Sequence, residues 1–375
     1  MGLQLYFLSI LVLCLRLATA YDSGSSNNVA VYWGQASAGS QERLSSYCQD
    51  SVDIVILAFL TTFFSSDDLP EINFASACSD TFSGTSLLEC DTIAEDIKTC
   101  QSAGKKVLLS LGGASGSYGF TGDDQAIEFA DTLWSIFGAG SGAEYRPFGD
   151  AIVDGFDLDI ENGNSVGYAA FATQMRNNYN GGDYYLSAAP QCPFPDASIG
   201  DALDNAWFDF VFIQFYNNYC AVTAPDQFNY DSDWMGWLSG TSLNRDAKLF
   251  VGVPGSSSAA GSGYATPSEL QTVVSAISDK SALGGVMIWD ASQCTQNMID
   301  GASFVSAVKD MLSDIDSTAA TSSVSSSVES VTSSSASTSL FIPVETSLAQ
   351  VMSVSDMALK SSLAAVDLYA VSEVT

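Results

Sequence analysis

The stretch DGFDLDIENG, residues 154–163, carries carboxylic acids at every second position: Asp157, Asp159 and Glu161. Successive side chains of a β-strand point to opposite faces, so we expect the three acids to share one face. Like charges held this close raise one another's pKa, which costs stability unless the cluster has a use. A carboxylic acid that keeps its proton near working pH is a general acid, the chemistry that glycosidases need.

The composition argues against several other chemistries. The chain has 375 residues and no histidine, which excludes Ser-His-Asp and Cys-His catalysis and most zinc hydrolase sites. Its formal net charge of −31 repels nucleic acid and anionic lipid and suits a neutral substrate. A metal site or a salt-bridge ladder is the alternative use of the acids, but the stretch lacks the Asn and Gly pattern of a calcium loop. We expect no metal and no cofactor.

The acids lie in the fourth of eight short apolar segments that are typical of buried parallel strands, with helix-like stretches between most of them. The segments are residues 28–33, 53–59, 107–112, 153–160, 184–190, 208–216, 248–254 and 284–289. This alternation predicts an α/β fold, a (β/α)8 TIM barrel; a doubly wound open sheet is the alternative. Active sites of such barrels lie at the C-terminal ends of the strands. The acids would then face the barrel mouth, Glu161 nearest the cleft, while Leu158 and Ile160 would face the helices.

Both ends of the chain differ from this body. Residues 1–20 contain an apolar run and end in small residues, which predicts a secretory signal peptide cleaved after Ala20. A membrane anchor is the alternative, but the apolar run is shorter than the about 20 residues that a membrane span needs. We assign residues 21–315 to the barrel, 316–340 to an extended, O-glycosylated Ser/Thr-rich linker, and 341–375 to a disordered tail. A plain disordered linker is the alternative to the glycosylated one. No later segment is apolar enough to span a membrane, so we expect a secreted protein.

The cysteines fit an oxidising compartment. Of eight, Cys14 would leave with the signal peptide, and none of the other seven forms a CxxC pair. Export would allow up to three disulfides and leave one thiol over. Spacing alone does not decide which cysteines pair.

The acidic stretch resembles the DxxDxDxE signature of glycoside hydrolase family 18, the chitinases. Further segments resemble the class III chitinases of plants and fungi, including those of yeasts, in the family's order: VYWGQ at 31–35, LAFL at 57–60, LSLGG at 109–113, QFYNN at 214–218 and MIWD at 287–290. The resemblance covers about residues 28–312. It implies a secreted endochitinase that hydrolyses β-1,4-linked N-acetylglucosamine polymers, with a role in fungal cell-wall remodelling.

The resemblance also implies a retaining reaction in which the substrate's own N-acetyl oxygen attacks the anomeric carbon. Glu161 would protonate the leaving oxygen and later activate water. Asp159 would hold the acetamido N–H and stabilise the oxazolinium ion, and Asp157 would share a proton with Asp159. Tyr216 would donate its hydroxyl to the acetamido oxygen.

The other residues that the resemblance assigns would line the substrate groove, with Trp289 as the aromatic floor under the cleaved sugar. They are Tyr32, Gln35, Phe59, Gly113, Gln214 and Trp289. Ordinary packing inside a barrel is the alternative for each. Ala114 departs from the relatives, which often have a third glycine at this position.

The resemblance further implies features of the backbone and of the cysteines. Non-proline cis peptide bonds are expected at Ala58–Phe59 and Trp289–Asp290. The implied disulfides are Cys48–Cys100, Cys78–Cys90 and Cys192–Cys220, and Cys294 would remain free.

Two other functions use the same residues differently. An endo-β-N-acetylglucosaminidase acting on N-glycans would share the acids and the acetamido chemistry. A catalytically silent chitin-binding lectin or inhibitor would be expected to have lost the acid or to have a blocked groove. Asp157, Asp159, Glu161 and Tyr216 are all present here. We expect a monomer whose partner is chitin or a chito-oligosaccharide, located outside the cell or at the cell wall.

Overall fold

The structure is a computed structural model that describes residues 21–48 and 51–331. The predicted signal peptide at residues 1–20 and the tail at 341–375 lie outside the described residues, as does the linker beyond residue 331. The chain divides into two units, Met1–Ser325 and Ser326–Thr375. Of the second unit, only the end of one helix is described.

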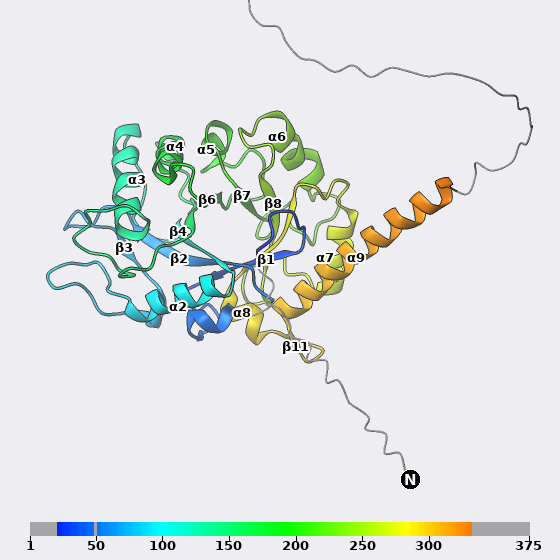
Figure 1. Cartoon of the computed structure of the whole chain (residues 1–375), viewed down its shortest axis with the longest axis horizontal. Coiled ribbons are helices and arrows are strands. Elements are labelled where there is room, and N and C mark those ends of the chain that lie inside the picture. Colours follow the sequence, from blue (N-terminus) through cyan, green and yellow to red (C-terminus); the bar gives the residue numbers. More distant parts are fainter. Residues whose placement is uncertain (1–20, 49–50, 332–375) are drawn as a thin grey trace, which may run out of the picture. The chain divides into compact units, whose positions relative to one another are not determined.

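Eight of the described strands are parallel and form the centre of the fold (Figure 1). They close into a barrel because β9 pairs with β1. They are β1 Asn28–Trp33, β2 Ile54–Thr62, β4 Lys106–Gly112, β5 Gly155–Asp159, β6 Tyr185–Ala188, β7 Phe210–Gln214, β8 Lys248–Pro254 and β9 Leu283–Trp289. Each coincides with one of the eight predicted segments to within a few residues. The predicted (β/α)8 barrel is confirmed.

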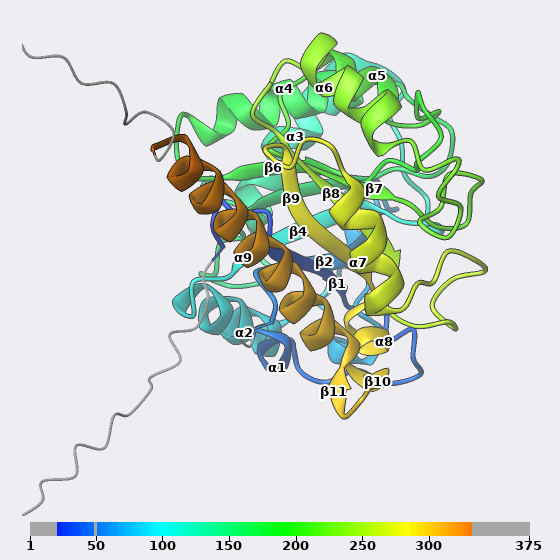
Figure 2. The same cartoon turned by 90° about the vertical axis from the view of Figure 1, so that its right-hand side faces the viewer.

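Helices surround these strands (Figure 2). They are α1 Leu44–Tyr47, α2 Asp91–Ser102, α3 Asp123–Phe137, α4 Tyr168–Tyr179, α5 Gly200–Asn205, α6 Met235–Gly240, α7 Pro267–Ala276, α8 Ala291–Gln296 and α9 Phe304–Val331. The smaller elements are β3 Glu71–Ile72, the hairpin β10 Met298–Ile299 with β11 Ala302–Ser303, and single turns at Ala75–Ala77 and Tyr230–Trp234.

The two faces of the strands pack into two separate cores. Side chains such as Ile56, Phe212 and Phe250 point inward and fill the barrel. Their neighbours on the opposite face, including Leu158, pack with Ile160 in the larger core that the helices complete. Because both faces are buried, the strands are continuous apolar runs in the sequence. The predicted outward orientation of Leu158 and Ile160 is confirmed.

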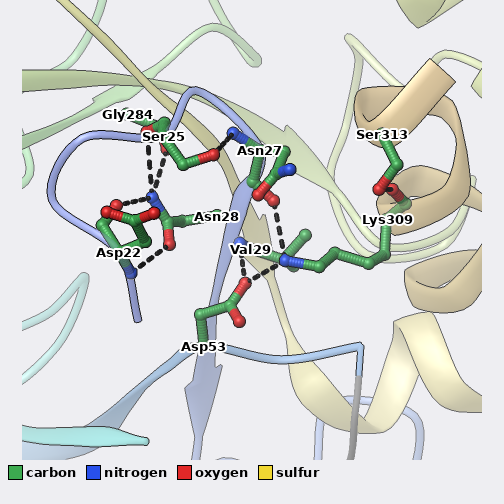
Figure 3. Close-up of polar contacts among 9 residues, drawn as sticks. All are labelled: Asp22, Ser25, Asn27, Asn28, Val29, Asp53, Gly284, Lys309 and Ser313. Atoms are coloured by element: carbon green, nitrogen blue, oxygen red, sulfur yellow. Dashed lines mark hydrogen bonds and ion pairs between the residues drawn. The ribbon is translucent and has the colours of Figure 1, made fainter. Parts of the chain in front are cut away.

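A buried carboxylate connects the N-terminal end of the barrel to α9, the last of the described helices (Figure 3). Asp53, which precedes β2, accepts a hydrogen bond from the Val29 N–H at 2.8 Å and pairs with Lys309 Nζ of α9 at 2.6 Å. Lys309 also donates to the Asn27 carbonyl at 2.9 Å. Because a buried charge is costly without its partner, this pair fixes α9 against the starts of β1 and β2.

Helix α9 differs from the prediction at its end. It crosses the boundary expected at residue 315 and continues to Val331, so the start of the Ser/Thr-rich segment is helical where an extended chain was predicted. Phe304, Val308 and Leu312, one turn apart, are buried against the barrel. This packing supplies the costly nucleus of the helix, after which extension into poorer helix formers is cheap. Composition alone does not predict that a packed first part extends the helix into this segment.

The disulfides are those that the family resemblance implies: Cys48–Cys100, Cys78–Cys90 and Cys192–Cys220. Cys294 is free and buried. The third bridge joins the loop after β6 to the loop after β7, both at the C-terminal end of the barrel. Among the described residues, no helix combines the length and the hydropathy that crossing a bilayer requires.

Candidate active site

The row of acids lies at the C-terminal end of β5, as predicted. Asp157 and Asp159 are among the last three residues of β5 and are almost fully buried, with 0% and 4% exposure. Glu161 follows the strand by two residues and is half-buried. The three side chains therefore step from the barrel interior towards its mouth.

Asp157 is the innermost acid, and three hydroxyl groups from three strands donate to it. The donors are Tyr32 at 2.9 Å, Ser110 at 2.7 Å and Ser187 at 2.6 Å. Ser110 and Ser187 are the residues that pair with Asp157 in the neighbouring strands, which puts all three at one level of the barrel. These hydrogen bonds favour the carboxylate, but burial is the stronger effect and raises the pKa of Asp157. The two serines were not predicted.

Asp159 is held by an amide. Gln214 Nε2 donates to Asp159 Oδ1 and to the Ala189 carbonyl, each at 3.0 Å. Burial raises the pKa of Asp159 well above its usual range, and the charges of Glu161 and Asp157 raise it further. The pKa of Glu161 is also raised, chiefly by burial. The cluster therefore retains protons at a pH where exposed carboxylic acids are ionised, as a general acid must.

The acids open onto a cavity of about 150 Å³ at the C-terminal ends of the strands. It is lined by Tyr32, Phe59, Ala114, Asp159, Glu161, Gln191, Gln214, Tyr216, Asn217, Asn218, Ala259 and Trp289. Seven of the predicted site residues are among them. A larger hollow of about 830 Å³ lies near the starts of the strands, beside Tyr185, Phe210 and Lys248, and contains none of the predicted residues. The smaller cavity is the candidate active site.

Three aromatic side chains form one wall of this cavity. The ring centroids of Phe59 and Trp289 are 5.9 Å apart, with 20° between the planes. Tyr32 lies 5.8 Å from Trp289 and 6.0 Å from Phe59. The peptide bonds Ala58–Phe59 and Trp289–Asp290 are cis, as the resemblance implies. A flat apolar wall beside carboxylic acids is suited to a sugar ring, whose faces are apolar and whose edges are polar.

A family model described as "Glycosyl hydrolases family 18" matches residues 28–262. This chain belongs to glycosyl hydrolase family 18. It is 53% identical to the endochitinase of Saccharomyces cerevisiae over 320 residues, which are 84% of this chain and 56% of the yeast protein. The family 18 chain thus spans little more than half the length of that relative.

Two crystal structures share the fold of this family 18 chain. A chitinase from Ipomoea carnea is 34% identical, with a TM-score of 0.65 over 76% of this chain and 99% of the other. A xylanase and alpha-amylase inhibitor protein from Scadoxus multiflorus is 31% identical, with a TM-score of 0.61 over 76% and 97%. Since proteins named as enzyme and as inhibitor share the fold, the side chains of the site must discriminate between these functions.

Two residues assigned to the groove do not line the cavity. Gln35 Nε2 donates to the carbonyls of Ala58 at 2.8 Å and Asn73 at 3.0 Å. Gly113 has φ +86°, and a Cβ atom there would lie 2.9 Å from the Phe59 ring. Gln35 therefore binds the main chain next to Phe59, and Gly113 leaves room for the Phe59 ring. The resemblance supplied their positions in the chain but not the direction in which their polar groups point.

Four lining residues were not predicted: Gln191, Asn217, Asn218 and Ala259. Asn218 Nδ2 donates to Gln191 Oε1 at 3.0 Å, which joins the loops after β7 and β6. The two asparagines belong to the QFYNN segment, so that motif was a usable signal for them. Gln191 and Ala259 lie in loops where no spacing rule applies. Ala114, the departure from the family pattern, places a methyl group at the cavity.

Proposed function

We propose that this family 18 protein is a secreted endochitinase that hydrolyses β-1,4-linked N-acetylglucosamine polymers with retention of configuration. The observation that carries the proposal is the row of buried acids that ends in Glu161 at an aromatic-walled cavity. The name of the yeast relative agrees with it. An inhibitor or lectin on this fold has no need of protonatable acids at the base of the cavity.

The reaction would divide into two proton transfers at Glu161. Glu161 gives its proton to the glycosidic oxygen as the bond to the anomeric carbon breaks, and the substrate's acetamido oxygen bonds to that carbon. The oxazolinium ion that results carries a positive charge. Water then bonds to the anomeric carbon as the bond between that carbon and the acetamido oxygen breaks, and the water gives a proton to the Glu161 carboxylate. This restores both the acid and the N-acetyl group and releases the sugar with retained configuration.

The neighbours of Glu161 suit the charges that this reaction develops. Asp159 would accept the acetamido N–H and stabilise the cation, and Asp157 behind it would share its proton. Burial and the charges of Asp159 and Glu161 raise the pKa of Tyr216 well above its usual value. Its hydroxyl therefore stays protonated and can donate to the acetamido oxygen.

Export and a role at the fungal cell wall are part of the proposal. The apolar N-terminal run with its small-residue end supports cleavage of a signal peptide. Three disulfides in one chain support an oxidising compartment. The Ser/Thr-rich composition beyond residue 316 supports O-glycosylation and attachment near the wall.

The test is hydrolysis of a fluorogenic chitotrioside by the wild-type protein and by Glu161→Gln, from about pH 3 to pH 8. Loss of the proton donor should lower kcat by about 10²–10⁴-fold, the usual contribution of general acid catalysis. Glu128→Gln, on the exposed face of α3, removes the same charge elsewhere and should leave kcat unchanged.

Three results would contradict the proposal. Equal activity in the wild type and in Glu161→Gln would remove Glu161 from its role. Binding of chitin without hydrolysis would indicate a lectin. Faster cleavage of an N-glycan than of chitotrioside would indicate an endo-β-N-acetylglucosaminidase.

A further inference from the structure

The main chain of Glu161 is bound by a side chain outside the predicted site. The Glu161 N–H donates to the hydroxyl oxygen of Tyr118 at 3.1 Å. The same hydroxyl donates to the Gly113 carbonyl at 2.6 Å. Tyr118 belongs to the loop between β4 and α3, and its side chain is half-buried. One hydroxyl thus connects the end of β4 to the residue proposed as proton donor.

This hydroxyl occupies a place in the ladder between β4 and β5. The Gly113 N–H donates to the Asp159 carbonyl at 2.7 Å. In a parallel pair, the N–H of one residue donates to a carbonyl on the partner strand. The carbonyl of the same residue accepts from the N–H that lies two residues later on that partner strand. For Gly113 that N–H belongs to Glu161. The Tyr118 hydroxyl stands between these two groups, so it joins them where a direct main-chain hydrogen bond would continue the ladder.

Further contacts keep Tyr118 in this place. Its carbonyl accepts a hydrogen bond from Asn162 Nδ2 at 2.9 Å, so its main chain and its side chain both contact the segment that carries Glu161. Its ring lies 5.6 Å from that of Phe63, which is fully buried. Burial raises the pKa of Tyr118, and the hydroxyl therefore remains a donor across the range in which carboxylic acids titrate.

We propose that Tyr118 is a positioning residue, whose hydroxyl replaces the missing ladder bond and thereby sets the place from which Glu161 delivers its proton. This rests on the proposed function of Glu161. The Tyr118 hydroxyl binds the main-chain N–H of Glu161, so it acts on the carboxyl group through the main chain. A general acid displaced by about 1 Å loses up to about 100-fold in rate, which is the scale of the effect.

The experiment compares Tyr118→Phe with wild type on two substrates. One is a chito-oligosaccharide, whose leaving group is a sugar hydroxyl and requires full protonation. The other is an aryl chitobioside with an acidic phenol as leaving group, which requires little. We expect kcat to fall by roughly 10–100-fold on the oligosaccharide, with KM nearly unchanged, and by much less on the aryl substrate. A general structural defect would lower both equally.

Tyr47→Phe is the matched control. The Tyr47 hydroxyl accepts the Glu42 N–H at 2.8 Å, away from the residues that line the cavity, so its loss should not change kcat on either substrate. Asn162→Ala removes the hydrogen bond to the Tyr118 carbonyl, so kcat on the oligosaccharide should fall more than kcat on the aryl substrate, by a smaller factor than in Tyr118→Phe. This second variant tests the role of Tyr118 even if Tyr118→Phe does not fold. Equal losses on both substrates, a change in KM alone, or no change would overturn the role of Tyr118. A wild-type protein inactive on both substrates would instead overturn the proposed function.

Discussion

Burial is the first cause of the raised pKa of each of the three acids at the barrel mouth. For Asp157 it outweighs the hydroxyl groups of Tyr32, Ser110 and Ser187, which act in the opposite direction. For Asp159 the neighbouring negative charges add to it. Such a cluster is unfavourable to folding whenever it is ionised, and the proposed acid chemistry accounts for its presence.

Asp159→Asn should stabilise the protein at neutral pH. Since the pKa of Asp159 is higher in the folded than in the unfolded chain, the folded state binds the proton more tightly. Stability from this group is present at low pH and is lost as the pH rises from the unfolded pKa through the folded one. The asparagine oxygen can still accept from Gln214. Urea unfolding should therefore show a gain over wild type at about pH 7 that shrinks at about pH 4, with chitinase activity lost.

The control for this substitution is Asp80→Asn, which removes the same charge from an exposed position. It should change the unfolding free energy little at either pH. A gain for Asp159→Asn that is equal at both pH values would show that the effect is not protonation. No gain in unfolding free energy at either pH would show that the buried Asp159 carboxylate does not destabilise the folded protein.

At the scale of elements, one buried ion pair joins helix α9 to the barrel beside their apolar contacts. Asp53 is 0% exposed and the Lys309 side chain 11% exposed. The first turns of α9 are apolar, and the helix then continues into a Ser/Thr-rich stretch with little intrinsic preference for helix. The ion pair therefore lies in the part of α9 that packs on the barrel, before the Ser/Thr-rich stretch begins.

Lys309→Ala should destabilise the protein by about 3–5 kcal/mol, the usual cost of leaving a buried charge without its partner. Chemical unfolding measures this. Because Asp53 and Lys309 lie at the N-terminal end of the barrel, kcat on chitotrioside should not change below the unfolding transition. Lys98→Ala breaks an ion pair whose side chains are 47% and 86% exposed and should change the unfolding free energy little, because solvent screens such a pair. A similar small cost for Lys309→Ala would mean that α9 is held by apolar packing alone.

At the scale of the whole molecule, charge is the dominant property. The chain has 43 acidic and 12 basic residues. A surface of this sign attracts cations over a distance set by the salt concentration, and it leaves neutral ligands unaffected. Chitin is neutral when fully acetylated and carries ammonium groups where acetyl groups have been removed. The protein should therefore distinguish the two forms by long-range attraction before either reaches the cavity.

Salt should consequently affect the two substrates differently. Between about 0.01 M and 1 M salt the screening length falls from about 30 Å to about 3 Å. Over this range kcat/KM for a soluble, partly deacetylated chitin should fall by roughly tenfold. The value for neutral chitotrioside, measured in parallel as the control, should stay constant. The same salt dependence for both substrates would contradict a role for the net charge.

The sequence by itself determined the parts that depend on local patterns. Buried parallel strands are continuous apolar runs, so all eight strands of the barrel were located. Side chains alternate along a strand, so the acids were placed on one face and Leu158 with Ile160 on the other. The disulfide pairs and the two cis peptide bonds followed from resemblance to a family, since spacing alone left them open.

Only the tertiary structure decided how distant segments meet. Ser110 and Ser187 contact Asp157 because strand pairing sets them at one level, and the register between strands is not encoded within any one of them. Tyr118 reaches Glu161 across 43 residues of chain, and Gln35 binds the Ala58 carbonyl and is not among the residues that line the cavity. Local propensity describes a segment alone, whereas hydrogen bonds, burial and pKa values arise from groups that folding brings together from different strands and loops.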